Sequence, residues 1–350
     1  MRFVRVIRNL RKRQGFSLID ACDDLPVAAE IDEKSERRHR DRSIVHRVPK
    51  LSVIIPTYRR ADILRRCLEH LEKQTAASDL EVIVVSDGKD RSTAALFELS
   101  SWRIPVKFFE IEKSQQGSAR NEGLRHAEGM YVLFIGDDIF LEPDACEKHL
   151  KTHESCELSA VSYEKQAPLK AQSSKLKAVL GFTTWDPAVG ITPVMKWLEK
   201  SGWQFGYQAL DKMRRIDCDS FIPRNFQHRY TYTSHISLPL SIAKKKLFRT
   251  DIHLYGWEDI EWGMRLRDSG VRLLYAPDAK ALHHHRMTLE ESLRRMETLG
   301  HSAVEIQKKV PEFDRVPKGW KLFTYRLLAL LPTLAGKHRK AFLSGLSEKR

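Results

Sequence analysis

An aspartate pair, Asp137 and Asp138, follows an apolar run, Val132 to Ile135, with only Gly136 between them. Such a run predicts a buried strand. Two carboxylates at the end of a buried strand are costly unless they meet a cation or a hydrogen-bonding ligand. In an open parallel sheet, ligands bind in the crevice beyond the carboxyl ends of the strands, where paired aspartates can hold a divalent metal that carries a diphosphate. The alternative is an acidic N-cap for a helix that begins near Glu142, and it accounts for only one of the two aspartates.

Strand and helix patterns alternate through the N-terminal half of the chain. Residues 51–55, 80–85 and 105–111 predict strands, whereas residues 61–74 and 117–127 have helical spacing. This alternation predicts right-handed βαβ units and a parallel sheet. The polar residues that follow the strands, Pro56-Thr57-Tyr58, Asp87 and the aspartate pair, should then meet along one edge of the sheet.

Several motifs resemble, in order and spacing, those of the inverting family 2 glycosyltransferases of the GT-A fold. They are SVIIPTYRR at 52–60, VVSDG at 84–88, GSARN at 117–121, the aspartate pair, YGWEDIEWGMRL at 255–266 and the histidines 283–285. The resemblance covers about residues 50 to 300. It implies an α/β, Rossmann-like fold with a mostly parallel central sheet flanked by helices. It also implies transfer of a sugar from a nucleotide-diphosphate sugar, UDP-sugar favoured, to a hydroxyl acceptor with inversion.

The predicted nucleotide-binding residues lie at the strand ends and on the helix after the third strand. They are Pro56, Thr57, Tyr58, Asp87, Arg120 and Asp137. Asp87 can accept a hydrogen bond from a base or ribose, and Arg120 can reach base or diphosphate oxygens. The alternatives are an Asx-turn at Asp87 and an exposed helix arginine at position 120. By the family pattern Asp137 contacts the ribose.

The resemblance assigns a divalent metal, Mg²⁺ or Mn²⁺, to Asp138. His283 is expected as a further metal ligand or a diphosphate contact, and His285 lies on the same side of a predicted strand. Imidazole together with carboxylate suits Mn²⁺ somewhat better than Mg²⁺. Gly136 stands where an aspartate commonly precedes the pair in the family, which leaves fewer carboxylates for the metal.

Attack by a hydroxyl needs a general base on the acceptor side. The candidates Glu258, Asp259 and Glu261 open a helix predicted from about residue 258 to 269. The resemblance favours Asp259 as base, with Glu258 as the second candidate and Glu261 in support. The alternative is that acidic residues simply favour a helix N-terminus. The predicted acceptor contacts are Trp257 and Trp262, which flank the cluster, and His235, where relatives frequently have asparagine.

Charge distribution and the family resemblance together predict four segments: a basic extension (1–49), a nucleotide-sugar half (50–155), an acceptor half (156–300) and a helical extension (301–350). The formal net charge is +14, and most of the excess lies in the two ends. Residues 320–334 form a basic amphipathic segment that could lie on an anionic membrane surface or pack on the domain. Five cysteines without paired spacing predict reduced thiols in a cytoplasmic protein, peripheral at most on the membrane.

Two other functions are open to a chain of this composition. A nucleotidyltransferase would need a Gly-rich, Lys-bearing phosphate loop after the first strand, and PTYRR at 56–60 is not one. A non-catalytic basic protein that binds membrane or nucleic acid should carry its charge across the whole body, and it would leave both acidic clusters unexplained. We therefore expect a nucleotide sugar and a glycan or lipid-linked glycan as partners, and no nucleic acid.

Overall fold

Four apolar runs form the parallel part of the sheet, as predicted. The structure is a computed structural model that describes residues 48–164, 176–216, 221–252 and 255–347. The strands are β1 (Leu51–Thr57), β2 (Leu80–Asp87), β3 (Val106–Ile111) and β4 (Tyr131–Ile135). β1 pairs in parallel with β2 and with β4, and β2 pairs in parallel with β3. All residues of β1, β2 and β4 are buried, because helices cover both faces of the sheet.

Of the helices between these strands, those over residues 61–72 and 116–126 lie where the sequence predicts them, whereas the helix between β2 and β3 was not predicted. They are α3 (Ala61–Glu72), α4 (Arg91–Leu99) and α5 (Gln116–His126), with a 3-10 turn, η1 (Ala77–Asp79), before β2. The predicted apolar face of α3, Leu64, Cys67, Leu68 and Leu71, is fully buried. Each buried leucine contributes roughly 1.5–3 kcal/mol, so this face holds the helix on the sheet.

Four more strands extend the sheet and make it mixed. They are β5 (Ile139–Leu141), β6 (Lys177–Trp185), β7 (His235–Pro239) and β8 (Arg272–His283). β7 is antiparallel to β4 and to β6, β6 is parallel to β8, and β5 is antiparallel to β8. The full order is β3-β2-β1-β4-β7-β6-β8-β5.

Two sequence-based boundaries were wrong. The pattern YTYTSHIS at 230–237 predicts a strand, but β7 begins only at His235, after the 3-10 helix η3 (Gln227–Tyr230), because the Thr231 hydroxyl donates to the carbonyls of His228 and Asp259. The helix expected near Glu142 begins at Ala145, since residues 139–141 pair with β8 first.

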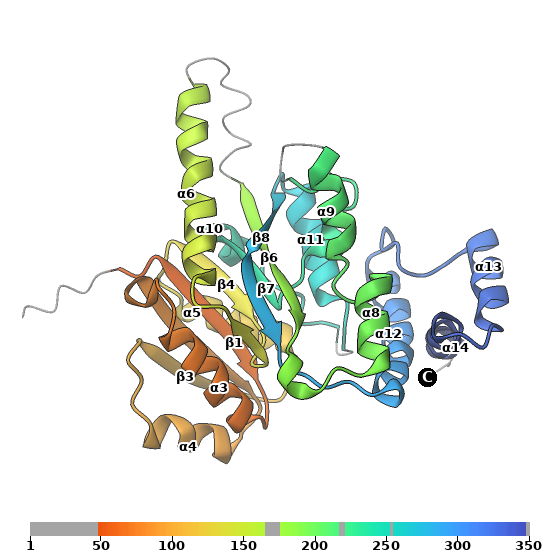
Figure 1. Cartoon of the computed structure of the whole chain (residues 1–350), viewed down its shortest axis with the longest axis horizontal. Coiled ribbons are helices and arrows are strands. Elements are labelled where there is room, and N and C mark those ends of the chain that lie inside the picture. Colours follow the sequence, from red (N-terminus) through yellow and green to blue (C-terminus); the bar gives the residue numbers. More distant parts are fainter. Residues whose placement is uncertain (1–47, 165–175, 217–220, 253–254, 348–350) are drawn as a thin grey trace, which may run out of the picture. The chain divides into compact units, whose positions relative to one another are not determined.

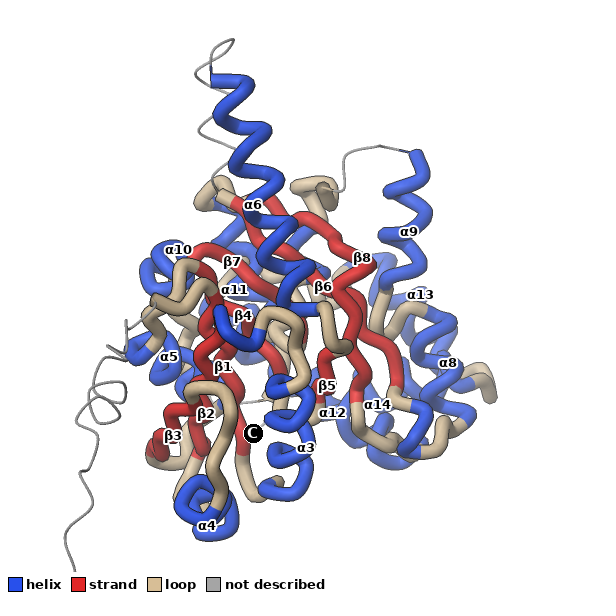
Figure 2. The backbone as a smooth tube through the Cα atoms, turned by 60° about the vertical axis from the view of Figure 1, so that its left-hand side comes forward, coloured by secondary structure: helices blue, strands red, loops and turns tan. Residues whose placement is uncertain are grey.

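The helices form two layers, one on each face of the sheet (Figures 1 and 2). One hydrophobic cluster joins the sheet to α3, α4 and α6 (Ala145–Glu164). The opposite cluster joins it to α5, α8 (Pro193–Ser201), α9 (Tyr207–Ile216), α10 (Leu240–Lys245) and α11 (Glu258–Asp268). The short 3-10 helix η2 (Pro187–Val189) connects β6 to α8.

The C-terminal part is helical, as predicted, with α12 (Leu289–Lys309), α13 (Gly319–Ala329) and α14 (Leu334–Ser347). A third apolar cluster, which includes Ile260, Ile306 and Phe342, packs α11 against α12 and α14. None of the helices in the described ranges is both long enough and apolar enough to cross a bilayer. The predictions for the basic extension concern residues 1–47, which lie outside the described residues, and only residues 48 and 49 of it are described.

Candidate active site

The first part of the site lies where β1 and β4 run side by side. Ile54 pairs with Phe134, and three residues later in the sequence of each segment Thr57 Oγ1 donates to Asp137 Oδ2 at 2.7 Å, just beyond the end of β4. The chain leaves β1 toward β2 and β3 and then returns to the other side of β1 as β4. Such a switch point opens a crevice at the carboxyl ends of the two strands. The structure therefore brings Thr57 and Asp137 together at the predicted edge.

Arg60 bridges the two aspartates. Its Nη1 lies 2.8 Å from Asp137 Oδ1 and its Nη2 lies 2.8 Å from Asp138 Oδ2. Burial, and then the charge of Asp138, raise the pKa of Asp137 to about 7. Burial also opposes ionisation of Asp138, but its contacts with His283 and Arg60 outweigh that cost and lower its pKa. The pair therefore holds one firmly ionised carboxylate beside one that can take up a proton near neutral pH.

Strand pairing across a long stretch of sequence brings His283 to Asp138. Ile139 pairs with His283 in the β5–β8 ladder, which places His283 Nε2 3.3 Å from Asp138 Oδ2. His285 Nδ1 lies 4.0 Å from the same oxygen, and the two imidazole rings stack with centroids 5.6 Å apart. The prediction that both histidines face one side is thus confirmed. The buried Nδ1 of His283 has no hydrogen-bond partner.

These donors fit a cation that takes part of its ligands from a substrate. Across the described ranges, no three His, Cys, Asp or Glu side chains are arranged to hold a metal by themselves. One carboxylate and one imidazole are nevertheless a suitable protein contribution, since Mg²⁺ and Mn²⁺ at nucleotide sites commonly take further oxygens from the phosphates.

A second polar cluster lies at the end of β2, where Asp87 is 6% exposed. Lys113 Nζ lies 2.6 Å from Asp87 Oδ2, and the Ser114 amide donates to Asp87 Oδ1 at 2.7 Å. The same Lys113 Nζ lies 3.9 Å from the centroid of the Tyr58 ring. The predicted Asp87 and Tyr58 are therefore adjacent, and a base that stacks on Tyr58 would share its face with Lys113. Pro56 is buried in β1 opposite Val85, two residues before Tyr58.

Arg120 of α5 contacts the start of α11. It is 3% exposed, so the alternative of an exposed helix arginine is wrong. Its Nη1 lies 3.4 Å from Glu258 Oε1, and its Nε is buried without a hydrogen-bond partner. The neighbouring Asn121 side chain bonds both the amide and the carbonyl of Phe248 and so ties α5 to the chain after α10.

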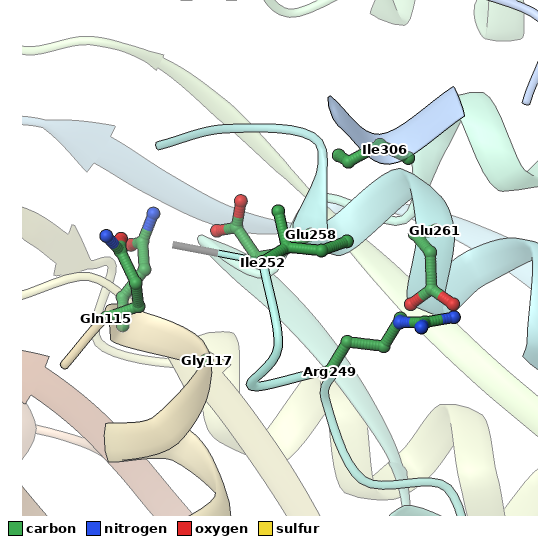
Figure 3. A pocket seen from close by; sticks show the side chains of 8 residues that line it. Gln115, Gly117, Arg249, Ile252, Glu258, Glu261 and Ile306 are labelled. Carbon is green, nitrogen blue, oxygen red and sulfur yellow. The ribbon is translucent and has the colours of Figure 1, made fainter. Parts of the chain in front are cut away.

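The three acidic residues at the start of α11 lie in different surroundings. Glu258 and Glu261 line a small cavity together with residues 115–117 of α5, as Figure 3 shows. Glu261 is almost fully buried and makes a bidentate pair with Arg265, Nε to Oε1 at 2.7 Å and Nη2 to Oε2 at 2.8 Å. Arg249 reaches toward the same carboxylate (Figure 3). The Glu261 carboxylate is therefore paired within α11.

The surroundings of Asp259 disfavour its ionised form. Burial, and then the charge of Glu258, raise the pKa of Asp259 to about 7, while Arg120 and Arg295 oppose that rise. Arg295 also acts on the pKa of His285, which burial lowers. Its charge therefore reaches both the acidic start of α11 and the histidines beside Asp138. Arg295 is a charged neighbour of Asp259 and His285 to which the sequence assigned no role.

Two of the predicted acceptor contacts must be corrected. Trp262 and His235 are both 0% exposed. Trp262 stacks on Phe248 in the core, and His235 Nε2 lies 3.1 Å from His149 Nε2 beneath the sheet. A direct acceptor contact needs solvent access, which neither side chain has. From the sequence, Trp262 and His235 could contact an acceptor. The orientation of α11 and of β7 instead points both side chains into the core.

Trp257 is the one predicted acceptor aromatic that keeps some exposure. It takes a left-handed conformation (φ 67°) just before α11, and its Nε1 donates to the Leu299 carbonyl at 2.8 Å. Arg60 and Lys113 are site residues to which the sequence assigned no role. Arg60 belongs to the PTYRR motif, so the sequence could have predicted a cation beside the aspartates. Arg295 had no local signal.

Comparisons with known proteins agree with this geometry. The model of glycosyl transferase family 2 matches residues 52–171, which hold both strand-end clusters. An uncharacterised glycosyltransferase of Bacillus subtilis, YfnE, is 27% identical over 67% of this chain and 64% of its own length. The validoxylamine A glucosyltransferase of Streptomyces hygroscopicus subsp. jinggangensis is 29% identical over 64% of this chain and 53% of its own length. The chain therefore spans less than two thirds of these relatives.

Solved structures overlap with the chain at lower identity. A mannosyltransferase of Pyrobaculum calidifontis, solved with GDP-Man and Mn²⁺, is 18% identical and covers 87% of this chain and 77% of its own, with a TM-score of 0.49. TarS of S. aureus is 18% identical over 80% of this chain and 42% of its own, with a TM-score of 0.47. Residues 52–171 therefore match the model of glycosyl transferase family 2, and the curated relatives of the chain are named as glycosyltransferases.

Proposed function

We propose that this protein is a glycosyltransferase that moves a sugar from a nucleotide-diphosphate sugar to a hydroxyl of a glycan or lipid-linked glycan. The observation that carries the proposal is the presence of two carboxylate clusters, one at the strand ends and one at the start of α11. Asp137 and Asp138 lie at the switch point of the sheet, and Asp259, with a pKa near 7, lies across Arg120 at the start of α11. The family match to residues 52–171 supports the donor half of this site.

In the proposed reaction, Asp259 takes the proton of the acceptor hydroxyl. The acceptor oxygen forms a bond to the anomeric carbon while the bond from that carbon to the diphosphate oxygen breaks and its electron pair leaves with the diphosphate. A base with a pKa near 7 is well matched to this task at neutral pH. A single displacement inverts the anomeric centre, and inversion follows from the family resemblance. Glu258 is the second candidate for the base.

On the donor side, Tyr58 and Asp87 would bind the base, and Thr57 and Asp137 would face the ribose. Asp138 and His283 would hold Mn²⁺ or Mg²⁺, which supplies electrostatic stabilisation to the departing diphosphate. Arg60 and Arg120 can add positive charge on either side of that diphosphate, since arginine binds phosphate oxygens without losing its proton. A UDP-sugar is the donor to test first.

The test starts with thermal unfolding of the purified chain against UDP, GDP, CDP and dTDP, each with Mn²⁺, Mg²⁺ or chelator. A ligand that binds only the folded state raises the unfolding temperature. We expect one nucleotide to stabilise the protein in a metal-dependent way, and Asp138→Asn to remove the metal dependence. The donor with the matching base is then assayed for release of nucleoside diphosphate.

The controls separate binding from chemistry. Asp259→Asn should keep the nucleotide-dependent shift and lose turnover, because this residue faces the acceptor half. Glu154→Gln, an exposed carboxylate on α6, is a matched control that should change neither. If no nucleotide shifts the unfolding temperature of a folded sample, the transferase proposal fails. Polymer formation from the donor would identify an activity in polysaccharide biosynthesis, and a soluble cytoplasmic fraction or a membrane pellet would locate it.

A further inference from the structure

The helix α13 has two apolar faces, of which one is covered. On the covered face Tyr325 packs edge-on against Phe342 of α14, with ring centroids 6.1 Å apart. Arg339 of α14 lies over the same tyrosine ring at 5.3 Å. α14 in turn packs on α12 through Gly345 and Gly300, whose Cα atoms leave no room for side chains between the helices. α13 is therefore mounted on the C-terminal helices and does not need its other face for folding.

The second face is a stripe of large apolar side chains that are exposed to solvent. Its members recur at intervals of three and four residues and continue past the helix end: Trp320, Phe323, Leu327, Leu330 and Leu331. Trp320 is 74% exposed, Phe323 is 70% exposed and Leu330 is 80% exposed. Five of the ten exposed large apolar residues in the described ranges lie in this stripe. A contiguous patch of this kind marks an interaction site, whereas single exposed apolar residues need no explanation.

The charge around the stripe has one sign. Between Asp314 and Glu348 the sequence has seven Lys or Arg residues and no Asp or Glu. Arg315 and Arg339 lie over aromatic rings, and the other five, Lys318, Lys321, Arg326, Lys337 and Lys340, are exposed. None of these five makes an ion pair with another described residue. An apolar stripe within a basic, acid-free segment complements a surface that offers negative charge above an apolar layer.

We propose that the α13 face, defined as Trp320, Phe323, Leu327, Leu330 and Leu331 with the five exposed cations of α13 and α14, docks on an anionic lipid bilayer. The apolar side chains would enter the boundary between headgroups and acyl chains, and the lysines would meet the lipid phosphates. Tryptophan suits this boundary because its ring is apolar and its N–H is polar. A second copy of the chain fits the face less well, because two such faces would bring only positive charges together.

This proposal adds to the proposed function the surface to which the enzyme binds. The evidence for that surface does not depend on transferase activity. The test is flotation of the full chain with vesicles of phosphatidylcholine alone or mixed with phosphatidylglycerol, at low and high salt. We expect the chain to float with the anionic vesicles and to be released by salt, because the Debye length shortens. The triple variant Trp320→Ser/Phe323→Ser/Leu327→Ser should bind at least about tenfold less.

Matched variants make the outcome specific. Leu99→Ser/Met130→Ser/Leu247→Ser removes the same number of exposed apolar side chains from other surfaces and should float like the wild type. Lys318→Gln/Lys321→Gln/Arg326→Gln should reduce binding to anionic vesicles and weaken its salt dependence. Circular dichroism and thermal unfolding confirm that each variant is folded.

Three results would overturn the proposal. The first is a wild type that floats with neither vesicle, and the second is a triple variant that floats as well as the wild type, which would move the activity to another segment. The third is a dimer in light scattering that the triple variant dissociates, which would assign the face to a second copy. Nucleotide-dependent thermal shifts of the same variants, measured in parallel, show whether the donor site is intact, so the two proposals can fail separately.

Discussion

Arg60 lies 2.8 Å from Asp138, with its Nη2 on Oδ2, and so places a positive charge at the carboxylate to which we assign the metal. Its other terminal nitrogen holds Asp137 at the same distance. The guanidinium thus offsets one of the two negative charges of the aspartate pair. A metal ion at Asp138 must compete with it, and a bound diphosphate offers Arg60 another anionic partner.

Removal of Arg60 should therefore strengthen metal binding in the absence of nucleotide. We expect Arg60→Ala to raise the affinity for Mn²⁺ about threefold to tenfold, because a partly exposed ion pair contributes only about 1 kcal/mol of free energy. Isothermal titration or electron paramagnetic resonance of free Mn²⁺ measures the change. The matched control is Arg59→Ala, because Arg59 lies over Tyr58 instead of the aspartates. Equal Mn²⁺ affinity in the wild type and Arg60→Ala would show that Arg60 does not compete.

Asp259→Asn should lower turnover by about 10²–10⁴-fold, the usual contribution of a general base. The substitution keeps an oxygen that can accept from the Ile260 amide, so the start of α11 should remain intact. Release of nucleoside diphosphate under saturating donor and acceptor measures the loss. Asp268→Asn, at the exposed end of the same helix, is the control and should retain full turnover. A comparable loss in Glu258→Gln alone, with Asp259→Asn active, would assign the base to Glu258.

The same substitution should stabilise the protein at high pH. Because burial raises the pKa of Asp259 to about 7, ionising this carboxyl costs more in the folded state than in the unfolded chain. That cost is absent below the ordinary carboxyl pKa and is complete once the pH has risen past about 7. We expect Asp259→Asn to increase the free energy of unfolding by about 1–3 kcal/mol at pH 8 and hardly at pH 4. Chemical denaturation at both pH values tests this, and an equal change at both would contradict it.

Three buried histidines should make the fold sensitive to acid. His149 and His153 of α6 both bond the Ser237 hydroxyl at 2.8 Å, and His235 bonds His149. Burial lowers the pKa of His153 to about 3 and that of His235 to about 4, and it lowers the pKa of His149 strongly. Below about pH 6.5 these histidines therefore become protonated in the unfolded chain, whereas they remain neutral in the folded chain.

The free energy of unfolding should consequently fall by about 1.4 kcal/mol per pH unit for each of these histidines as the pH drops from 6.5 toward 4. Urea denaturation between pH 7.5 and 4.5 measures the slope. His153→Phe keeps the ring that stacks on Tyr131 and removes one titrating group, so its slope should be shallower. Identical slopes for the two proteins would rule out His153 as a contributor.

Gly181 should be irreplaceable while His235 is present. A Cβ at position 181 in β6 would overlap the imidazole of His235 on the neighbouring strand. Inserting a methyl group into such a packed core costs about 1–3 kcal/mol, so Gly181→Ala should lower the free energy of unfolding by that amount. In Gly181→Ala/His235→Ala the methyl no longer meets a ring. The double variant should be more stable than the sum of the two single effects predicts, and simple additivity would contradict the contact.

The sequence by itself determined the parallel core and the edge at which the site forms. Apolar runs that end in polar residues define strands locally, and parallel strands must bring their carboxyl ends to one edge, so Thr57, Asp87 and Asp137 follow from the pattern alone. The acidic start of α11 was predictable for the same reason, since helix starts have local signals. The placement of Asp138 against His283 was expected only through the family resemblance.

Only the tertiary structure decided how distant segments meet. The pairing of β5 with β8 brings His283 to Asp138, and the packing of α12 brings the charge of Arg295 to Asp259 and His285. Burial of Trp262 and His235, and exposure of Trp320, likewise depend on which neighbour covers each face. The spacing of apolar residues shows which face of a helix is apolar. Only long-range packing determines which neighbour covers that face. For that reason the sequence could offer either a membrane or the domain as the cover for α13, whereas the structure packs one face and leaves the other exposed.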